Sequence, residues 1–188
     1  MTGDDTVTGG AKSTGTVEGL VTAPAESAPP ERHETVEIMS GGVAGDRYCR
    51  GEGHFQLDAC AVTLVAAEAL DAVADDIGVD LSDGRHRRNM VVRGFGDGMD
   101  TLLDATVAVG DALLRPTSRR PPCSHLEQLA GEQGVASALK NRGGLCCDVV
   151  EPGAVSVGDS VRIVEADPRT AGAAIAERLD ADDDSNHG

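Results

Sequence analysis

The sequence predicts a mainly β protein with a few helices, of the α+β class, built around a barrel or barrel-like sheet. Valine recurs in short runs, which favours strands. Gly-Asp pairs such as Gly110-Asp111 and Gly158-Asp159 separate neighbouring runs and are typical of tight turns. The helical segments do not alternate regularly with strands and GxGxxG is absent, so a Rossmann-type fold is not indicated.

Strands are expected where a short run alternates or is rich in β-branched residues between polar, Gly or Pro positions. These runs are Thr16–Thr22, Thr35–Ile38, Ala61–Val65, Met90–Val92, Thr106–Val109, Ala112–Thr117, Leu145–Val150 and Ser160–Val164. Pro24, Pro29 and Pro30 interrupt regular structure after the first run, because proline has no N–H to donate. Gly110-Asp111 joins two of the runs, which therefore predict a hairpin.

The clearest helix signal starts at Ala66. From there Ala69, Leu70, Val73 and Ile77 recur at spacings of three and four, and Gly78 follows where a helix commonly ends. Two shorter helices are expected at 124–132 and 135–141. Together these segments indicate one domain over residues 15–165, preceded by a flexible lead (1–14) and followed by an acidic, largely disordered tail (166–188).

Acidic residues dominate the charge of the chain. Asp and Glu number 32 against 16 Lys and Arg, which gives a formal net charge of −16. Such a chain repels polyphosphates, so a nucleic-acid partner is not expected. The acidic, lysine-poor composition resembles that of proteins from salt-loving microbes, whose surface carboxylates are screened by salt. A specific acidic docking face is the alternative.

Five cysteines give an odd count, without CxxC and without a Cys/His cluster at zinc spacing. Adjacent Cys146 and Cys147 on a strand point to opposite faces, so a bridge between them is not expected. Both are assigned to core packing, with a resolving role towards Cys123 as the alternative. No membrane-length apolar run or signal peptide is present, and a reducing, cytoplasmic setting is expected.

Cys123 is the strongest candidate for a functional atom. It follows Arg119-Arg120-Pro121-Pro122 and stands at the start of an expected helix. Positive charge and a helix N-terminus both favour the thiolate, which is the reactive form of cysteine. The alternative is that Cys123 is a small buried apolar residue.

Two further segments bear on ligand binding. Arg85-His86-Arg87-Arg88-Asn89 is the densest basic cluster in the acidic chain, and guanidinium groups bind phosphate and carboxylate bidentately. Pairing with the protein's own carboxylates is the alternative for this cluster. The glycine-rich segment 40–47 ends in Asp46-Arg47 but lacks GxxxxGK[ST]; it is interpreted as a turn with a local ion pair, with a pocket-lining loop as the alternative.

An ordered set of motifs resembles the MOSC domain, the family named after the C-terminal domain of molybdenum-cofactor sulfurase. The matching segments are Gly45-Asp46-Arg47, Val62-Thr63-Leu64 with Glu68, Arg87–Val92, Val109–Ala112, Arg120–Cys123, and Gly143-Gly144 with Val157-Gly158-Asp159. They span about residues 15–165, with no sign of the pyridoxal-phosphate-binding domain of the full sulfurase. The resemblance implies a stand-alone MOSC protein with a MOSC-type β-barrel.

The resemblance also implies two chemistries at Cys123. The cysteine either ligates molybdenum in the molybdenum cofactor (molybdopterin), for reduction of N-hydroxylated compounds, or carries sulfur as a persulfide. Arg47, Arg87, Asn89 and Arg120 are the implied cofactor-binding residues. Pyridoxal phosphate is expected only on a separate partner. The implied protein partners are a cysteine desulfurase or an electron-donor protein.

Other interpretations remain open. A non-catalytic barrel could bind a small anionic ligand through Arg87, Asn89 and Arg47 while Cys123 only packs. His125 is interpreted as a surface residue, with a proton-donor role as the alternative. The scarcity of aromatic side chains (one Tyr, two Phe and no Trp) does not favour stacking of a pterin ring.

Overall fold

The computed structural model describes residues 14–49 and 60–165. The expected lead and tail lie outside these residues, apart from Thr14. The strands are β1 (Thr14–Thr22), β2 (Glu31–His33), β3 (Thr35–Met39), β4 (Gly42–Val43), β5 (Val62–Ala66), β6 (Met90–Arg93), β7 (Thr106–Val109), β8 (Ala112–Arg119), β9 (Leu145–Glu151), β10 (Gly153–Ser156) and β11 (Ser160–Glu165). The helices are α1 (Ala67–Ile77), α2 (Ser124–Ala130), α3 (Val135–Ala138) and the 3₁₀ segment Gly96–Leu102.

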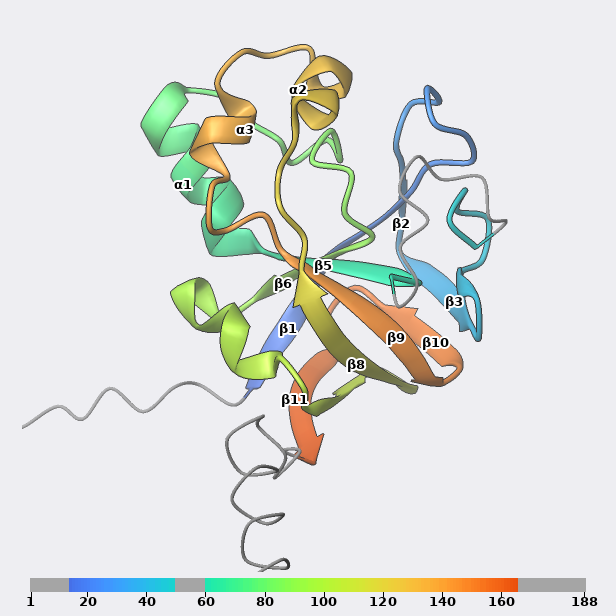
Figure 1. Ribbon diagram of the computed structural model, residues 1–188. Helices are drawn as coiled ribbons and strands as arrows, with labels where there is room; N and C mark the ends of the chain where they lie inside the picture. Colours follow the sequence, from blue (N-terminus) through green and yellow to red (C-terminus); the bar gives the residue numbers. More distant parts are fainter. Residues whose placement is uncertain (1–13, 50–59, 166–188) are drawn as a thin grey trace, which may run out of the picture.

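A closed barrel forms the centre of the molecule (Figure 1). Its seven strands follow the order β11-β7-β8-β9-β5-β6-β1, and the pairing of β1 with β11 closes the ring. Every neighbouring pair in the ring is antiparallel except β5 and β6, which are parallel. The predicted mainly β, α+β class and the barrel are therefore confirmed.

Strand β1 takes part in two pairings along its length. Residues 14–16 pair with β11, whereas residues 20–22 pair with β2, and a register shift between Val17 and Gly19 separates the two halves. Such an irregularity bends a strand and increases its twist. A second sheet, of order β10-β3-β4, lies beside the barrel.

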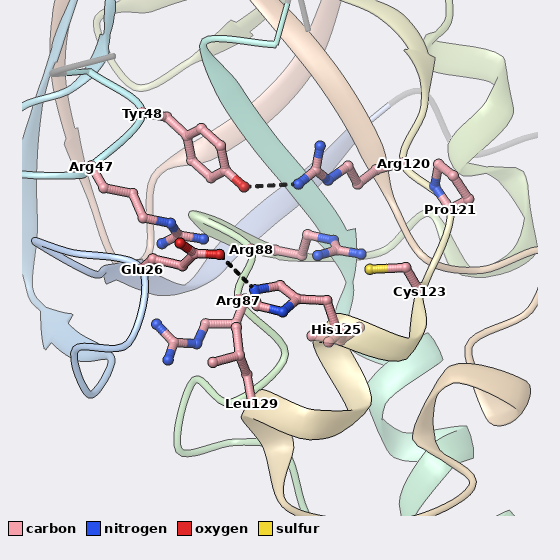
Figure 2. Close-up of a pocket in the computed structure, with 11 residues that line it drawn as sticks. Glu26, Arg47, Tyr48, Arg87, Arg88, Arg120, Pro121, Cys123, His125 and Leu129 are labelled. Atoms are coloured by element: carbon pink, nitrogen blue, oxygen red, sulfur yellow. Dashed lines mark hydrogen bonds and ion pairs between the residues drawn. The ribbon is translucent and has the colours of Figure 1, made fainter. Parts of the chain in front are cut away.

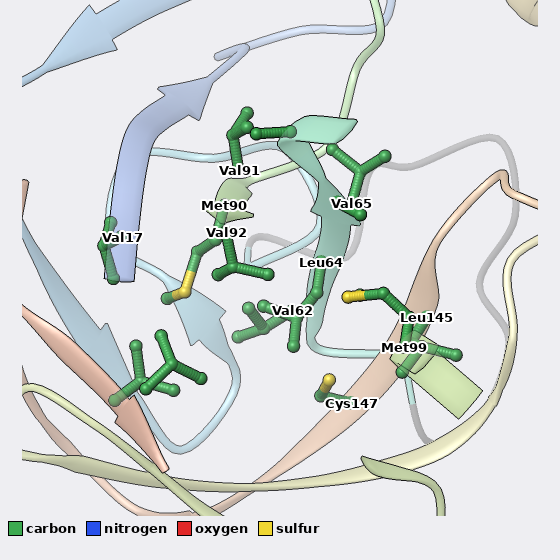
Figure 3. Close-up of a cluster of buried hydrophobic side chains, with 14 of the residues drawn as sticks. Val17, Val62, Leu64, Val65, Met90, Val91, Val92, Met99, Leu145 and Cys147 are labelled. Carbon is green, nitrogen blue, oxygen red and sulfur yellow. The ribbon is translucent and has the colours of Figure 1, made fainter. Parts of the chain in front are cut away.

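Aliphatic side chains fill the barrel (Figure 3). All five residues of β5 are buried, as expected for a strand covered on both faces. Met90 and Val92 of β6, together with Leu145 and Cys147 of β9, contribute to the same cluster. Since the chain has almost no aromatic residues, small branched side chains provide nearly all of this packing.

The parallel pair β5–β6 determines where the functional candidates lie. Parallel neighbours need a long crossover, and here α1 and the following loop provide it. Helix α1 ends at Gly78, which adopts the left-handed conformation (φ 70°) predicted for it. The returning loop delivers Arg87 and Arg88 to the start of β6.

Three of the described strands, β2, β4 and β10, were not predicted from the sequence, and neither was a disulfide. Strand β4 lies within the glycine-rich segment 40–47, which was interpreted as a turn or loop. Strand β2 follows two prolines and β10 follows Pro152, so both were interpreted as breaks. Cys146 and Cys147 are both buried as expected, at 1% and 0% exposed, and Cys146 in addition forms a disulfide with Cys60. None of the described helices is long and apolar enough to cross a membrane.

Candidate functional site

A cavity of about 210 Å³ lies between α2 and the loops beside the barrel (Figure 2). Its lining consists of Glu26, Arg47, Tyr48, Arg87, Arg88, Arg120, Pro121, Cys123, His125, Leu126 and Leu129. The structure thus brings together four of the five site residues predicted from the sequence: Arg47, Arg87, Arg120 and Cys123. They come from three segments that are distant in the sequence.

Cys123 is half-buried and directly precedes α2. The backbone before it is held against a glycine turn, because the Arg120 N–H donates to the Gly144 carbonyl at 2.7 Å. A Cβ on Gly143 would lie only 2.4 Å from the Arg120 carbonyl oxygen and 2.8 Å from Pro122 Cδ. The absence of a side chain at Gly143 therefore lets the Arg120–Cys123 segment approach β9.

Arg119 does not face this cavity, contrary to the expectation that both arginines would stabilise the Cys123 anion. Its side chain is exposed and ion-paired with Asp100, with Arg119 Nη2 2.5 Å from Asp100 Oδ2. Successive residues of an extended segment point in opposite directions, so only Arg120 faces the cavity. Arg119 instead lines a neighbouring groove of about 700 Å³, which also includes Lys140 and Arg142.

The loop before β6 has an unusual backbone that positions two arginines. Arg87 has φ 59°, a left-handed conformation that is uncommon for a residue with a Cβ. The Arg87 N–H donates to the Gly84 carbonyl at 2.9 Å, and the Arg88 N–H donates to His86 Nδ1 at 3.0 Å. Burial lowers the pKa of His86 to about 3, so its ring is neutral and Nδ1 can accept.

Arg88 lines the cavity and is only 4% exposed. Its Nε donates to the Gly143 carbonyl at 2.8 Å and its Nη1 to the His86 carbonyl at 3.3 Å. Burial, with a smaller contribution from the charge of Arg120, lowers the pKa of Arg88 to about 9, while the Cys123 sulfur acts in the opposite direction. Arg88 therefore remains a cation at neutral pH.

The segment ending in Asp46-Arg47 lines the cavity, so it is more than a turn. The buried Asp46 carboxylate accepts backbone N–H groups from Ala23 at 2.9 Å and Tyr48 at 3.0 Å. Arg47 and Tyr48 are thereby held at the cavity wall. The guanidinium carbon of Arg47 lies 4.4 Å from the centre of the Tyr48 ring, a cation–π contact, and Arg120 Nη2 donates to the Tyr48 hydroxyl at 3.0 Å.

Three guanidinium nitrogens of residues that line the cavity have no hydrogen-bond partner among the described residues. They are Arg47 Nε, Arg87 Nε and Arg87 Nη1, and all three atoms are buried. Burial, with the neighbouring charge of Arg47, also lowers the pKa of Arg87. Unpaired buried donors are costly, and an anion that accepted from them would offset that cost.

Asn89, the fifth predicted residue, is not part of the lining. Its side-chain oxygen accepts from the N–H of Thr63 at 3.0 Å and from the Thr63 hydroxyl at 2.9 Å, while its amide donates to the Val21 carbonyl at 3.3 Å. Asn89 thus joins β5 and β1. Arg85 also lies apart, with Nη1 2.8 Å from the Ala130 carbonyl and Nε 2.6 Å from Asp83.

Sequence reasoning missed Arg88, Tyr48 and Glu26 as lining residues. Arg88 belonged to the noted basic cluster, whereas Tyr48 directly follows Arg47 and is the only tyrosine. Glu26 had no signal, since it lies in a proline-flanked loop. Its carboxylate is 3.1 Å from His125 Nε2, so His125 lines the cavity and is not simply a surface residue.

The chemistry available here is that of one soft sulfur ligand beside several cations. Among the described residues, no group of three or more His, Cys, Asp or Glu could hold a metal ion. A metal bound at Cys123 would therefore need its other ligands from a cofactor. A single thiolate suits molybdenum or sulfane sulfur, and the unpaired arginine donors suit a phosphate.

Comparisons with known proteins agree with this fold. The structure resembles YuaD from Bacillus subtilis (TM-score 0.65, 22% identity, covering 79% of this chain and 94% of that one). It also resembles YiiM from Geobacillus stearothermophilus (TM-score 0.57, 18% identity, 80% and 73% covered) and from Escherichia coli (0.57, 17%, 80% and 70%). A search of curated proteins returned no match. The model of the MOSC domain matches residues 50–162, so this chain belongs to the MOSC domain family.

Proposed function

We propose that the cavity binds the molybdenum cofactor, with Cys123 as the protein ligand to the metal. One observation carries this proposal: Arg47 and Arg87 line the cavity that contains Cys123, and both have buried guanidinium nitrogens without a hydrogen-bond partner among the described residues. The MOSC family is associated with this cofactor, which combines a phosphate with a thiolate-binding metal. When bound, the cofactor supplies a redox-active centre suited to the reduction of N-hydroxylated compounds.

The residues of this chain would divide the work of binding. Arg47 and Arg87 would donate to the phosphate, and Arg120 would add a third cation beside Tyr48. Arg88 is buried and its hydrogen bonds go to backbone carbonyls, so its charge would be available to stabilise a Cys123 thiolate. Leu126 and Leu129 form an apolar part of the lining, which limits the access of water to the sulfur.

The second candidate function is transport of sulfur as a persulfide on Cys123. The observation that favours it is that Cys123 is half-buried in an open cavity, with the Arg88 cation behind it. A persulfide needs a thiolate that a donor can reach. The proposed donor is a cysteine desulfurase, which would carry its own pyridoxal phosphate. An electron-donor protein is the proposed partner in the cofactor-binding function, and the cytoplasm is the proposed location of both.

Metal and pterin analysis tests the cofactor proposal. The protein and its variants are expressed in a host that makes the cofactor, and molybdenum and pterin are measured per chain. We expect the natural chain to retain both, Cys123→Ser to lose molybdenum, and Arg87→Gln to retain about tenfold less cofactor. Arg93→Gln is the matched control, because Arg93 is an exposed arginine of β6 paired with Glu18 and Asp71.

The outcome separates the candidate functions. A natural chain that retains neither molybdenum nor pterin contradicts cofactor binding. If that chain then accepts labelled sulfur from a cysteine desulfurase, and Cys123→Ser does not, the sulfur-carrier function stands. If the natural chain retains neither molybdenum nor pterin and accepts no sulfur, the remaining candidate function is binding of a small anion without chemistry at Cys123.

A further inference from the structure

The Cys60–Cys146 disulfide is buried, and neither of its residues lines the cavity. Cys60 precedes β5 and Cys146 belongs to β9, and these strands are antiparallel neighbours with Val62 opposite Cys147 and Thr63 opposite Cys146. The Ala61 N–H also donates to the Cys147 carbonyl at 3.0 Å. The backbone ladder therefore holds the two strands together independently of the disulfide.

One arginine connects this disulfide to the cavity. Arg120 is 9% exposed, and its Nη1 lies 4.0 Å from Cys60 Sγ. Its Nη2 donates to the Tyr48 hydroxyl at 3.0 Å, and its guanidinium carbon is 5.6 Å from the centre of the Tyr48 ring. The same guanidinium group thus contacts a redox-capable sulfur on one side and a residue of the cavity lining on the other.

We propose that Cys60–Cys146 is a reversible thiol–disulfide site, and that its redox state sets how strongly Arg120 binds an anion in the cavity. The first part stands on the disulfide and its contact with Arg120. The second part rests on the proposed anion-binding function. The reactant class is a small dithiol reductant, because Cys60 is only 9% exposed and Cys146 only 1%.

The reaction balances as a two-electron exchange. A thiolate of the reductant attacks Cys60 Sγ, the S–S bond breaks, and Cys146 leaves as a thiolate that takes up a proton. The second thiol of the reductant then attacks the mixed disulfide and releases Cys60. The protein ends with two reduced cysteines, and the reductant ends as a disulfide.

Reduction changes the sulfur that Arg120 meets. A disulfide sulfur is neutral and a weak acceptor, whereas a reduced cysteine can become a thiolate, which a neighbouring guanidinium favours. Reduced Cys60 therefore competes with Tyr48 and with a bound anion for Arg120. Since β5 and β9 keep their ladder, the effect is confined to the Arg120 side of the cavity.

The experiment uses the full chain without cofactor and inorganic phosphate as the probe. Alkylation under denaturing conditions should label the three free cysteines (Cys49, Cys123 and Cys147) before dithiothreitol treatment of the folded protein, and all five afterwards. In ¹⁵N spectra, the Arg120 Nε–H signal, assigned with Arg120→Lys, should shift on reduction. The Arg93 and Arg142 signals should not shift, because these arginines pair with surface carboxylates. The dissociation constant for phosphate should rise about tenfold.

Two matched variants separate the effect of the Cys60 sulfur on Arg120 from the effect of losing the Cys60–Cys146 disulfide. Cys146→Ala leaves Cys60 as a thiol, so it should bind phosphate as weakly as the reduced protein. Cys60→Ala removes the sulfur that contacts Arg120, so it should bind phosphate as tightly as the oxidised protein. Neither variant should respond to dithiothreitol, and both retain the β5–β9 ladder.

Several results would overturn the proposal. They are a disulfide that dithiothreitol does not reduce in the folded protein, an Arg120 signal that does not shift, and equal phosphate affinities for the two single variants. Failure of the proposed function looks different, because phosphate then fails to bind in either redox state. In that case the alkylation count and the Arg120 signal decide the redox site by themselves.

Discussion

Arg88 and Gly143 are joined across 55 positions of sequence by a hydrogen bond of 2.8 Å, from Arg88 Nε to the Gly143 carbonyl. The bond connects the loop that carries Arg87 to the glycine turn against which Arg120–Cys123 packs. This buried hydrogen bond therefore connects the two sides of the cavity, the Arg87 loop and the Arg120–Cys123 segment.

Replacing Arg88 should destabilise the folded protein more than replacing an exposed arginine of the same charge. We expect Arg88→Ala to lower the free energy of unfolding by about 1–3 kcal/mol, because the Gly143 carbonyl loses its buried donor. Arg93→Ala is the control and should cost less than about 1 kcal/mol, since its ion pairs are exposed to water. Urea unfolding measures both, and equal losses would contradict the role assigned to Arg88.

Gly143 should tolerate no side chain. In Gly143→Ala the new Cβ would meet the Arg120 carbonyl oxygen at 2.4 Å, so the segment leading to Cys123 must shift. We expect a loss of about 1–3 kcal/mol in unfolding free energy and a changed alkylation rate at Cys123. Gly98→Ala is the matched control, because a Cβ there meets nothing within 4 Å. The prediction is wrong if the two variants behave alike.

Asn89 and Arg87 should separate folding from binding. Asn89→Ala should lower the unfolding free energy by about 1–3 kcal/mol, because Thr63 loses its buried acceptor, and should leave phosphate affinity unchanged. Arg87→Gln should weaken phosphate binding about tenfold with a smaller effect on stability. Thermal unfolding and phosphate titration of both variants provide the check, and the opposite pattern would return Asn89 to the binding site.

His86 should make the protein less stable as the pH falls. Burial lowers the pKa of His86 to about 3 in the folded state, against 6.5 as the ordinary value. Between these values the unfolded chain binds a proton that the folded protein excludes. Stability therefore falls as the pH decreases from 6.5 towards 3, by at most about 1.4 kcal/mol per pH unit from this group.

The variant His86→Gln isolates that contribution from the carboxylates. Glutamine does not titrate, so the difference between the two pH profiles of unfolding free energy belongs to His86. Asp80 and Asp100, whose pKa values are lowered by hydrogen bonds from Ser82 and Arg119 respectively, cancel in the difference. Parallel profiles would show that His86 does not titrate as described.

Salt should stabilise the folded chain. A net charge of −16 creates repulsion that is weakened when the screening length falls from about 10 Å at 0.1 M to about 3 Å at 1 M salt. We expect the unfolding temperature to rise by about 5 °C between 0.1 M and 1 M KCl. Calorimetry at several KCl concentrations tests this, and a flat or falling dependence would remove the comparison with proteins of salt-loving microbes.

The elements that were predicted correctly have a recognisable pattern within their own residues. Strand β5 is a continuous apolar run, and α1 combines a helical period with a terminal glycine. Strand β2 does not carry such a signal, because its charged residues form a strand only by pairing with β1. Similarly, β10 follows a proline and is defined by pairing with β3. Non-local pairing of this kind cannot be read from local pattern.

The candidate site was predictable in part for the same reason. Cys123, Arg120, Arg87 and Arg47 stand in recognisable local motifs, and the fold brings them together. Asn89 was predicted to bind the cofactor but does not line the cavity, whereas Arg88, for which no separate role was predicted, does. Spacing along an irregular loop does not determine which side chain faces a cavity. The Cys60–Cys146 bond joins residues 86 positions apart and has no local signature.

Closure of the barrel by β1 and β11 has a consequence for synthesis of the chain. Thr14–Thr16 pair with Ser160–Arg162, so a nascent chain cannot complete the ring until the last described strand has left the ribosome. Until then β1 and β7 present unpaired edges, which are prone to pairing with other chains. Folding is therefore expected to finish after translation, and to be most vulnerable to aggregation just before β11 emerges.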